Sequence, residues 1–200
     1  MPSDLPVTYS ERFDQAVALA VRDFRPIVRK KGNIPYITHL FAVTALVGEH
    51  GGDEDQLIAA VLHDWLEDIE GATPARLEAE FGPRVREFVE ALSDVVSIRP
   101  KPPWRDRKTA FIDRIRNEAV EVKLICTADK LHNVRSLRRE VEAEGAAALD
   151  HFNGGRDGTL WYYAAMVHAL GQGWRHPLLD ELTSAVAGLH TDCGAPWESA

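Results

Sequence analysis

The chain has 200 residues, of which 45% are hydrophobic, and this length and composition predict one domain with a buried core over residues 1–200. Its formal net charge of -8 argues against a sequence-independent DNA or RNA binder, which needs a basic surface to displace counterions. No apolar run is long enough to span a bilayer, and the first ten residues lack the regions of a signal peptide, so we expect a cytoplasmic protein.

Helical periodicity organises the first quarter of the chain. Apolar residues recur at helical spacing from Ser10, a plausible N-cap, to Phe24, with room for one further turn through Val28. A loop at 32–33 then leads to a strongly apolar helix that closes at 51–52. In that helix His39 lies on an apolar side, where a histidine is either a core residue or a ligand.

The stretch from Ile58 to Ile69, IAAVLHDWLEDI, is predicted to be a helix that Asp53 caps. Its polar face carries His63, Asp64, Glu67 and Asp68. These groups would repel one another, since no Lys or Arg lies among them, and a bound cation would remove the conflict. An imidazole beside carboxylates suits a divalent transition metal better than calcium. The alternative is a solvated acidic face on an amphipathic helix.

Two scaffold helices are predicted over 74–81 and 83–96, each started by a proline. The proline-rich, basic segment 97–107 is predicted to be a loop, which either lines a site entrance or simply connects two helices. Trp104 in it either stacks on a base or pins the loop.

A helix over 108–116 and a long helix after it are predicted next. The long helix contains Asp129, which Ile125 and Cys126 precede at helical spacing. Its carboxylate is therefore expected to be partly desolvated and to need a cation or several donors. A structural salt bridge to Lys130 or Arg135 is the alternative.

The remaining segments are a loop over 153–158, an aromatic-rich helix after it and a last helix from 176 to 189. No alternating strand pattern of useful length appears, so the predicted fold class is all-α, a helical bundle. The two cysteines, Cys126 and Cys193, form no CxxC arrangement and are expected to be reduced. His151, His168 and the histidines after them are assigned to structure or surface.

His39, the pair His63-Asp64 and Asp129 occur in the order that the HD phosphohydrolase superfamily uses to hold one divalent metal. Within it the chain resembles the hydrolase domain of the RelA/SpoT group and the small alarmone hydrolases. Three blocks between 24 and 137 carry the likeness: RKKGNIPYITH resembles RKxGxPYIxHP, HDWLED resembles HDxxED, and VKLICTADKLHN resembles VKLADRLHN. Residues 138–190 would be a helical extension and 191–200 a tail.

The sequence departs from the family pattern at three points. One extra residue lies between Gly32 and Pro35, Leu40 replaces the family's proline after the ligand histidine, and Lys130 replaces its usual arginine after the last ligand. The ligand set is intact.

The resemblance implies a metal-dependent nucleotide phosphohydrolase that removes the 3′-pyrophosphate of guanosine tetra- or pentaphosphate. It implies manganese, held by His39, His63, Asp64 and Asp129. Glu67 and Asp68 would orient water and protonate the leaving group. The candidate substrate contacts are Arg29, Lys30, Lys123, Lys130 and Asn133.

Two other functions stay open: a phosphatase acting on NADPH or another phosphorylated nucleotide, and a catalytically silent, metal-bound sensor. The resemblance implies a small phosphorylated nucleotide as the partner, with no nucleic acid and no membrane expected. Local clusters of basic residues in an acidic chain fit a small polyanionic substrate better than a nucleic acid.

Overall fold

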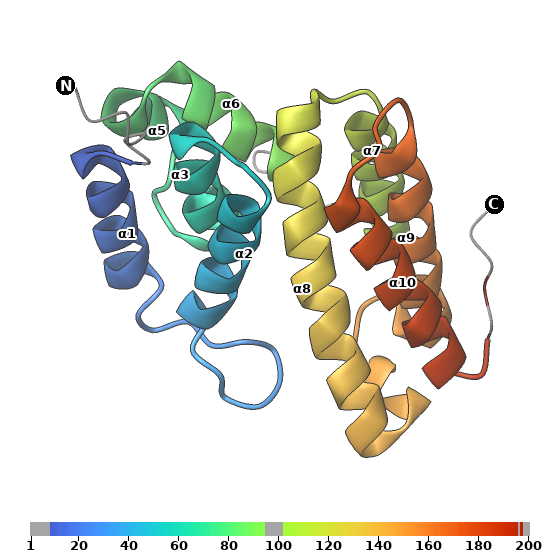
Figure 1. Ribbon diagram of the computed structural model, residues 1–200. Coiled ribbons are helices and arrows are strands. Elements are labelled where there is room, and N and C mark those ends of the chain that lie inside the picture. Colours follow the sequence, from blue (N-terminus) through green and yellow to red (C-terminus); the bar gives the residue numbers. More distant parts are fainter. Residues whose placement is uncertain (1–8, 95–101, 196, 198–200) are drawn as a thin grey trace. The chain divides into compact units, whose positions relative to one another are not determined.

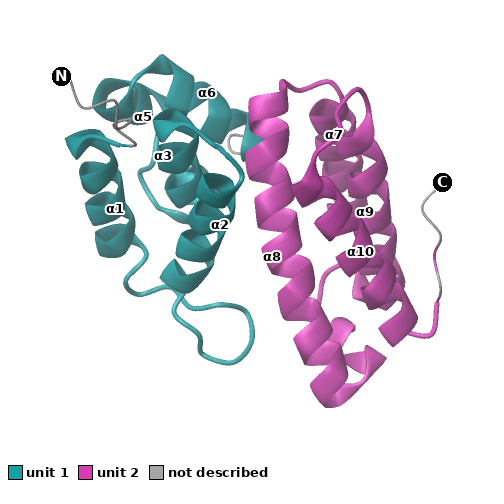
Figure 2. Ribbon diagram, viewed as in Figure 1, with its two compact units in different colours: residues 1–93 teal, residues 94–200 magenta. Residues whose placement is uncertain are grey.

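The computed structural model describes residues 9–94, 102–195 and 197. Apart from an isolated bridge between Val28 and Pro35, the regular elements of these ranges are all helices (Figure 1). The predicted all-α class is confirmed. The chain divides into two compact units, Met1–Ser93 and Asp94–Ala200 (Figure 2). The predicted single domain, with its extension over 138–190, stays a prediction.

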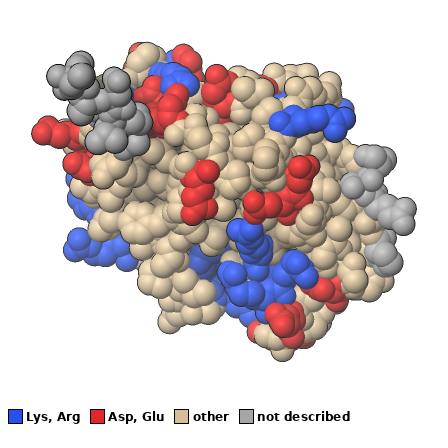
Figure 3. Space-filling view, viewed as in Figure 1, with Lys and Arg blue, Asp and Glu red and all other residues tan. Residues whose placement is uncertain are grey.

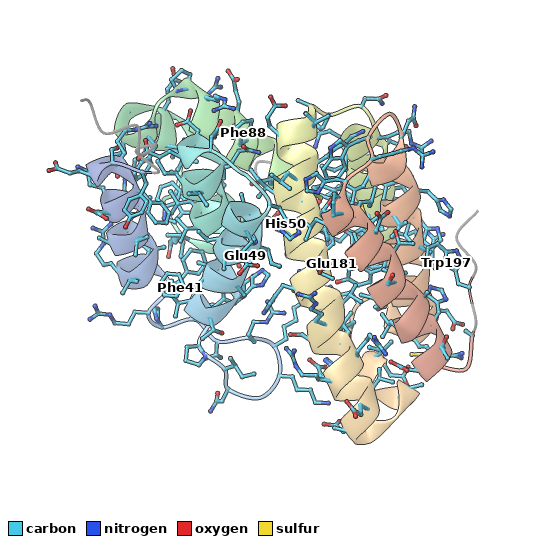
Figure 4. All side chains as sticks on the ribbon, viewed as in Figure 1. Phe41, Glu49, His50, Phe88, Glu181 and Trp197 are labelled. Carbon is cyan, nitrogen blue, oxygen red and sulfur yellow. The ribbon has the colours of Figure 1, made fainter. Side chains whose placement is uncertain are left out.

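The first unit is built around a short buried helix. Its elements are α1 (Glu11–Asp23), α2 (Ile37–Glu49), α3 (Glu54–Leu62), α4 (Trp65–Asp68), α5 (Pro74–Phe81) and α6 (Pro83–Leu92). The helix α3 contacts α1, α2 and α6, and its last five residues, from Ile58 to Leu62, are completely buried. The helix α2 buries Leu40 and Val43 and exposes Phe41, which Figure 4 labels.

Local side-chain caps start three of these helices where the sequence predicts them. The Ser10 hydroxyl accepts from the Arg12 amide at the start of α1, and the Thr73 hydroxyl accepts from the Arg76 amide at the start of α5. At α3, Asp53 and Gln56 form a capping box, in which each side chain accepts from the other residue's backbone N–H.

The prediction of one continuous helix over 58–69 is wrong. The helix α3 ends at Leu62 and α4 begins at Trp65, and between them Asp64 has φ -96° and ψ 0°. The side chains of His63 and Asp64 contact the first turn of α2 and the loop before it. These tertiary contacts override the local helical periodicity.

The further helical turn through Val28 is also absent. The Arg29 N–H instead donates to the Ile34 carbonyl at 2.8 Å, and the Tyr36 N–H donates to the Ile27 carbonyl at 3.0 Å. Positive φ values at Gly32 and Asn33, 82° and 55°, allow the chain to reverse between these pairs. The loop predicted at 32–33 is therefore the tip of a tight turn.

The second unit is organised around one long helix. Its elements are α7 (Trp104–Arg116), α8 (Val120–Glu144), the 3-10 helix η1 (Ala146–Leu149), α9 (Gly155–Gly171) and α10 (Pro177–Asp192). The helix α8 contacts α9, α10 and η1, while α7 packs against α9.

Three predicted boundaries need correction. The helix α6 ends at Leu92 rather than at 96, α7 already starts at Trp104, and α9 starts at Gly155 inside the predicted loop 153–158. The Trp104 ring accounts for the early starts of α7 and α9. It packs edge-on against Trp161, and it lies so close to Gly154 that a Cβ at that position would be 2.5 Å from the ring. Trp104 thus anchors α7 on α9. Residues 97–101 of the predicted loop lie outside the described residues.

Both cysteines are buried and free of disulfide bonds, as expected. Burial raises the pKa of the Cys126 thiol to about 12, so this side chain is an inert core residue. Within the described ranges, no helix combines the length and the apolar character that crossing a membrane requires.

Candidate metal centre

Three predicted ligands lie together in the first unit. His39, in the first turn of α2, and His63, directly after α3, are 1% and 3% exposed. Their Nε2 atoms are 3.2 Å apart. The Asp64 Oδ2 atom lies 3.0 Å from Nε2 of His63 and 3.7 Å from Nε2 of His39.

One hydrogen bond determines the tautomer of His63. Its Nδ1 atom lies 2.8 Å from the Ala60 carbonyl oxygen, and a carbonyl can only accept, so Nδ1 carries the hydrogen. In the neutral ring, Nε2 then directs its lone pair toward the Asp64 carboxylate and His39. Two electron-rich atoms 3.0 Å apart repel each other unless a proton or a cation lies between them.

This donor set fits a divalent metal ion. Metal-binding histidines commonly donate their second ring N–H to a backbone carbonyl, as His63 does to Ala60. Two imidazole nitrogens with one carboxylate oxygen are ligands that divalent transition metals accept readily. The break between α3 and α4 makes the set possible, because it turns Asp64 away from a regular helical position.

Tyr36 belongs to this cluster, although the sequence analysis did not select it. Its hydroxyl donates to Oδ2 of Asp64 at 2.7 Å. Its ring stacks on Phe24 with centroids 5.5 Å apart and meets the His39 ring edge-on at the same distance. The Arg29 guanidinium lies 5.7 Å from its centroid. Tyr36 precedes His39 by three residues in the block PYITH, and that spacing was the available signal.

The predicted catalytic carboxylates are on α4. Glu67 is half-buried and Asp68 is exposed, and the backbone N–H groups of both donate to the Asp64 carbonyl, at 3.1 and 3.0 Å. This short helix is therefore tied directly to a predicted ligand. Of the predicted substrate contacts in this unit, Arg29 is half-buried and Lys30 is exposed.

Trp65 anchors the turn that carries the cluster. It is completely buried, its Nε1–H donates to Oδ2 of Asp23 at 2.9 Å, and the Arg76 guanidinium lies 5.0 Å from its ring centroid. Burial opposes the charge on Asp23, but hydrogen bonds from Arg22 and Trp65 outweigh it and lower the pKa of the carboxyl. Trp65, which follows Asp64, is thus fixed to α1 by its hydrogen bond to the Asp23 carboxylate.

The second unit brings together the fourth predicted ligand and two predicted substrate contacts. Asp129, on α8, is 7% exposed. Its Oδ2 atom accepts from Nζ of Lys130 and its Oδ1 atom from Nδ2 of Asn133, both at 2.5 Å. Burial opposes the charge on Lys130, but attraction to Asp129 raises its pKa well above the ordinary value. Asp129 therefore makes the salt bridge to Lys130 that the sequence left open, whereas Arg135 pairs with Glu181.

The contacts of Lys123 point to a structural role rather than to substrate binding. Its side chain is buried, and Nζ donates to the carbonyls of Arg116 and Gln172 at 3.0 and 2.6 Å. These carbonyls lie at the C-terminal ends of α7 and α9, where a cation satisfies acceptors that the helix leaves open. We therefore do not include Lys123 in the proposed site.

Fold and cluster together define an all-α protein with a buried His–Asp site suited to a divalent metal. A family model described as "HD domain" matches residues 16–159. The chain therefore belongs to the HD domain family, as its motifs predicted.

Several similar proteins are named for the hydrolysis or the synthesis of guanosine polyphosphates. The chain is 33% identical over 180 residues to the "Bifunctional (p)ppGpp synthase/hydrolase SpoT" of Escherichia coli, an alignment that covers 84% of this chain and 23% of that protein. It is 35% identical over 107 residues to the "Guanosine-3′,5′-bis(diphosphate) 3′-pyrophosphohydrolase MESH1" of Xenopus tropicalis, covering 52% of this chain and 57% of that one. The chain thus spans about a quarter of the length of the bifunctional relative and over half of the shorter one.

A solved structure shares the fold along nearly the whole chain. It is described as a metazoan ortholog of SpoT that hydrolyses ppGpp, and it matches with a TM-score of 0.74 and 26% identity over 93% of this chain and 97% of that one.

Proposed function

We propose that this protein is a metal-dependent hydrolase that removes the 3′-pyrophosphate from guanosine tetra- and pentaphosphate. The observation that carries the proposal is the cluster of His39, His63 and Asp64, in which the two Nε2 atoms are 3.2 Å apart and Oδ2 of Asp64 lies 3.0 and 3.7 Å from them. Relatives named for this reaction, among them the metazoan protein with the same fold, support the choice of substrate. The cytoplasmic location stays a prediction.

In this proposal four residues hold the metal, which we expect to be manganese: His39, His63, Asp64 and Asp129. The order of these residues in the chain, which follows the HD motif, supports Asp129 as the fourth ligand. When bound, the ion supplies Lewis acidity that polarises the phosphoryl group and makes water more acidic.

The chain's own side chains would do the remaining work. Glu67, one turn after Asp64 and half-buried, would accept the proton of the attacking water, and Asp68 would donate a proton to the departing ribose 3′-oxygen. Water attacks phosphorus and the bond to that oxygen breaks, without a covalent enzyme intermediate. Arg29 and Lys30 would contact the base or its phosphates, while Lys130 and Asn133 would contact the ribose or phosphates.

The deciding experiment is a product assay on a panel of substrates with added manganese. The panel contains guanosine tetraphosphate, guanosine pentaphosphate, NADPH and nucleoside monophosphates. We expect pyrophosphate from the first two and no orthophosphate from the others, and no product when Asp64→Ala replaces the wild type. Orthophosphate from NADPH or a monophosphate would assign a different substrate. No product from any compound, with metal shown to be bound, would favour a sensor.

A further inference from the structure

A basic pocket lies in the second unit, along the C-terminal half of α8. Its volume is about 570 Å³, and it is lined by Arg135, Arg138, Arg139, Val141, Glu142 and Asp192. Pockets that bind small molecules measure roughly 300 to 1,000 Å³. Half of the lining residues are arginines in a chain with a net charge of -8. On the face seen in Figure 3, Lys and Arg side chains also gather rather than spread evenly.

The helix α10 makes room for one of these arginines. Nε of Arg138 donates to Oδ2 of Asp192 at 2.8 Å. In this position the Arg138 guanidinium lies directly over Gly188. A Cβ at position 188 would lie 2.5 Å from Cζ of Arg138, so any larger residue would push the guanidinium away. The absence of a side chain at Gly188 therefore determines where this positive charge lies.

The other two arginines differ in their partners. Nη2 of Arg135 donates to Oε2 of Glu181 at 2.8 Å; Figure 4 labels Glu181, which belongs to α10. Nη2 of Arg139 donates to the Ser136 hydroxyl at 3.0 Å, and in the part of the chain that the structure describes no carboxylate lies within ion-pair distance of Arg139. Exposed ion pairs contribute at most about 1 kcal/mol, so a phosphate can compete with Glu181 and Asp192.

We propose that this pocket binds a phosphorylated ribose compound of the nucleoside diphosphate class. Guanidinium groups bind phosphate oxygens in pairs, and the three arginines offer such groups from one side of α8. The carboxylates of Glu142 and Asp192 accept hydrogen bonds from ribose hydroxyls. Both kinds of group line the same pocket.

This site is distinct from the proposed metal site. Arg138 follows Asp129 by nine residues, which at about 3.6 residues per turn are two and a half turns. Arg138 thus projects from the face of α8 opposite to Asp129, so a group bound by Arg138 is not a ligand of a metal that Asp129 holds. The inference holds whether or not the proposed reaction is correct.

The test is calorimetric titration of the full-length protein with guanosine diphosphate and, separately, with inorganic pyrophosphate. Two variants change the pocket in different ways: Arg139→Ala removes an exposed charge, and Gly188→Ala displaces Arg138 while every charge stays. Each should weaken diphosphate binding by about tenfold or more, which corresponds to the loss of a charged hydrogen bond. Since alanine is a better helix former than glycine, weaker binding by Gly188→Ala would not reflect unfolding.

Two controls separate this site from the metal centre. Arg116→Ala, an exposed arginine on α7, should leave binding unchanged, and Asp64→Ala should leave the pocket's binding event in place. The proposal is overturned if wild-type protein binds no guanosine diphosphate, or if Asp64→Ala abolishes binding that the pocket variants keep. Equal affinity for pyrophosphate would overturn the ribose part. Binding of single-stranded RNA that depends on Arg139, without binding of the diphosphate, would assign the pocket to a nucleic acid.

Discussion

At Asp64, one carboxylate oxygen accepts a hydrogen bond from Tyr36 and lies 3.0 Å from Nε2 of His63. Such a hydrogen bond orients the carboxylate. The Nδ1–H of His63, bound to the Ala60 carbonyl, does the same for the imidazole. At the scale of single residues, we expect the proposed site to depend on these two outer contacts as well as on the proposed ligands.

Replacing a ligand and replacing a proton carrier should have different effects. We expect Asp64→Ala to lose bound metal, because it removes one of the four proposed ligands together with a negative charge that offsets the charge of the ion. We expect Glu67→Gln to retain the metal and to lose most turnover, since glutamine cannot accept the proton. Metal analysis by mass spectrometry and product release check both. Full metal occupancy in Asp64→Ala would refute the ligand assignment, and normal turnover of Glu67→Gln would remove that residue from catalysis.

Tyr36→Phe tests the outer contact. The variant keeps the ring that stacks on Phe24 and loses only the hydroxyl, so metal affinity should fall by about 10- to 100-fold with little change in fold. A competition titration with a metal-binding dye measures the affinity. Tyr9→Phe, at an exposed tyrosine, is the matched control. Equal metal affinity of the two variants would show that the Tyr36 hydroxyl does not support the site.

At the scale of elements, the proposed site depends on the break between α3 and α4, where His63 and Asp64 lie. The hydrogen bond between Trp65 and Asp23 fixes this break to α1. The indole N–H of Trp65 donates to Asp23, a residue of α1, and the turn that carries His63 and Asp64 is thereby tied to α1. The short helix α4, with only four residues, could not keep its position through its own hydrogen bonds.

Asp23→Asn should destabilise the protein by about 1 kcal/mol at pH 7, because it weakens a charged hydrogen bond. The pKa of Asp23 is lowered in the folded state, so its contribution is present above the ordinary pKa of 3.8 and is lost as the pH falls through the lower folded value. The difference between variant and wild type should therefore shrink near pH 3. Urea unfolding at both pH values measures it, and a difference that does not change with pH would contradict the charge effect.

At the scale of the whole molecule, the first unit contains three proposed ligands, and in the second unit α8 carries Asp129 on one face and Arg138 on the opposite face. A metal that binds only the folded chain raises stability by mass action, by about 2.7 kcal/mol at a concentration one hundred times Kd. Manganese should therefore raise the Tm of wild-type protein and leave that of Asp64→Ala unchanged. Scanning calorimetry with and without a chelator checks this, and an equal shift in both proteins would indicate binding elsewhere.

Much of the molecule was predictable because its determinants are local. Ser10, Asp53 and Thr73 begin helices through their own side chains, and the apolar spacing between caps predicts helices without reference to the rest of the chain. The likeness to the HD family also depends only on residue types in order. The sequence by itself therefore determined the fold class and the family, and it selected the three side chains that meet in the first unit, which we propose as metal ligands.

The tertiary structure decided what depends on distant atoms. The helix predicted over 58–69 breaks at His63-Asp64 because those side chains contact Tyr36 and His39, and no local pattern encodes that contact. Lys123 is a candidate substrate contact from the sequence, but its ammonium group donates to the carbonyls of Arg116 and Gln172. In the arginine pocket, the Arg138 guanidinium can take its position only because Gly188, on α10, has no side chain. In each case the deciding interaction joins groups far apart in the chain, and only folding brings them within reach.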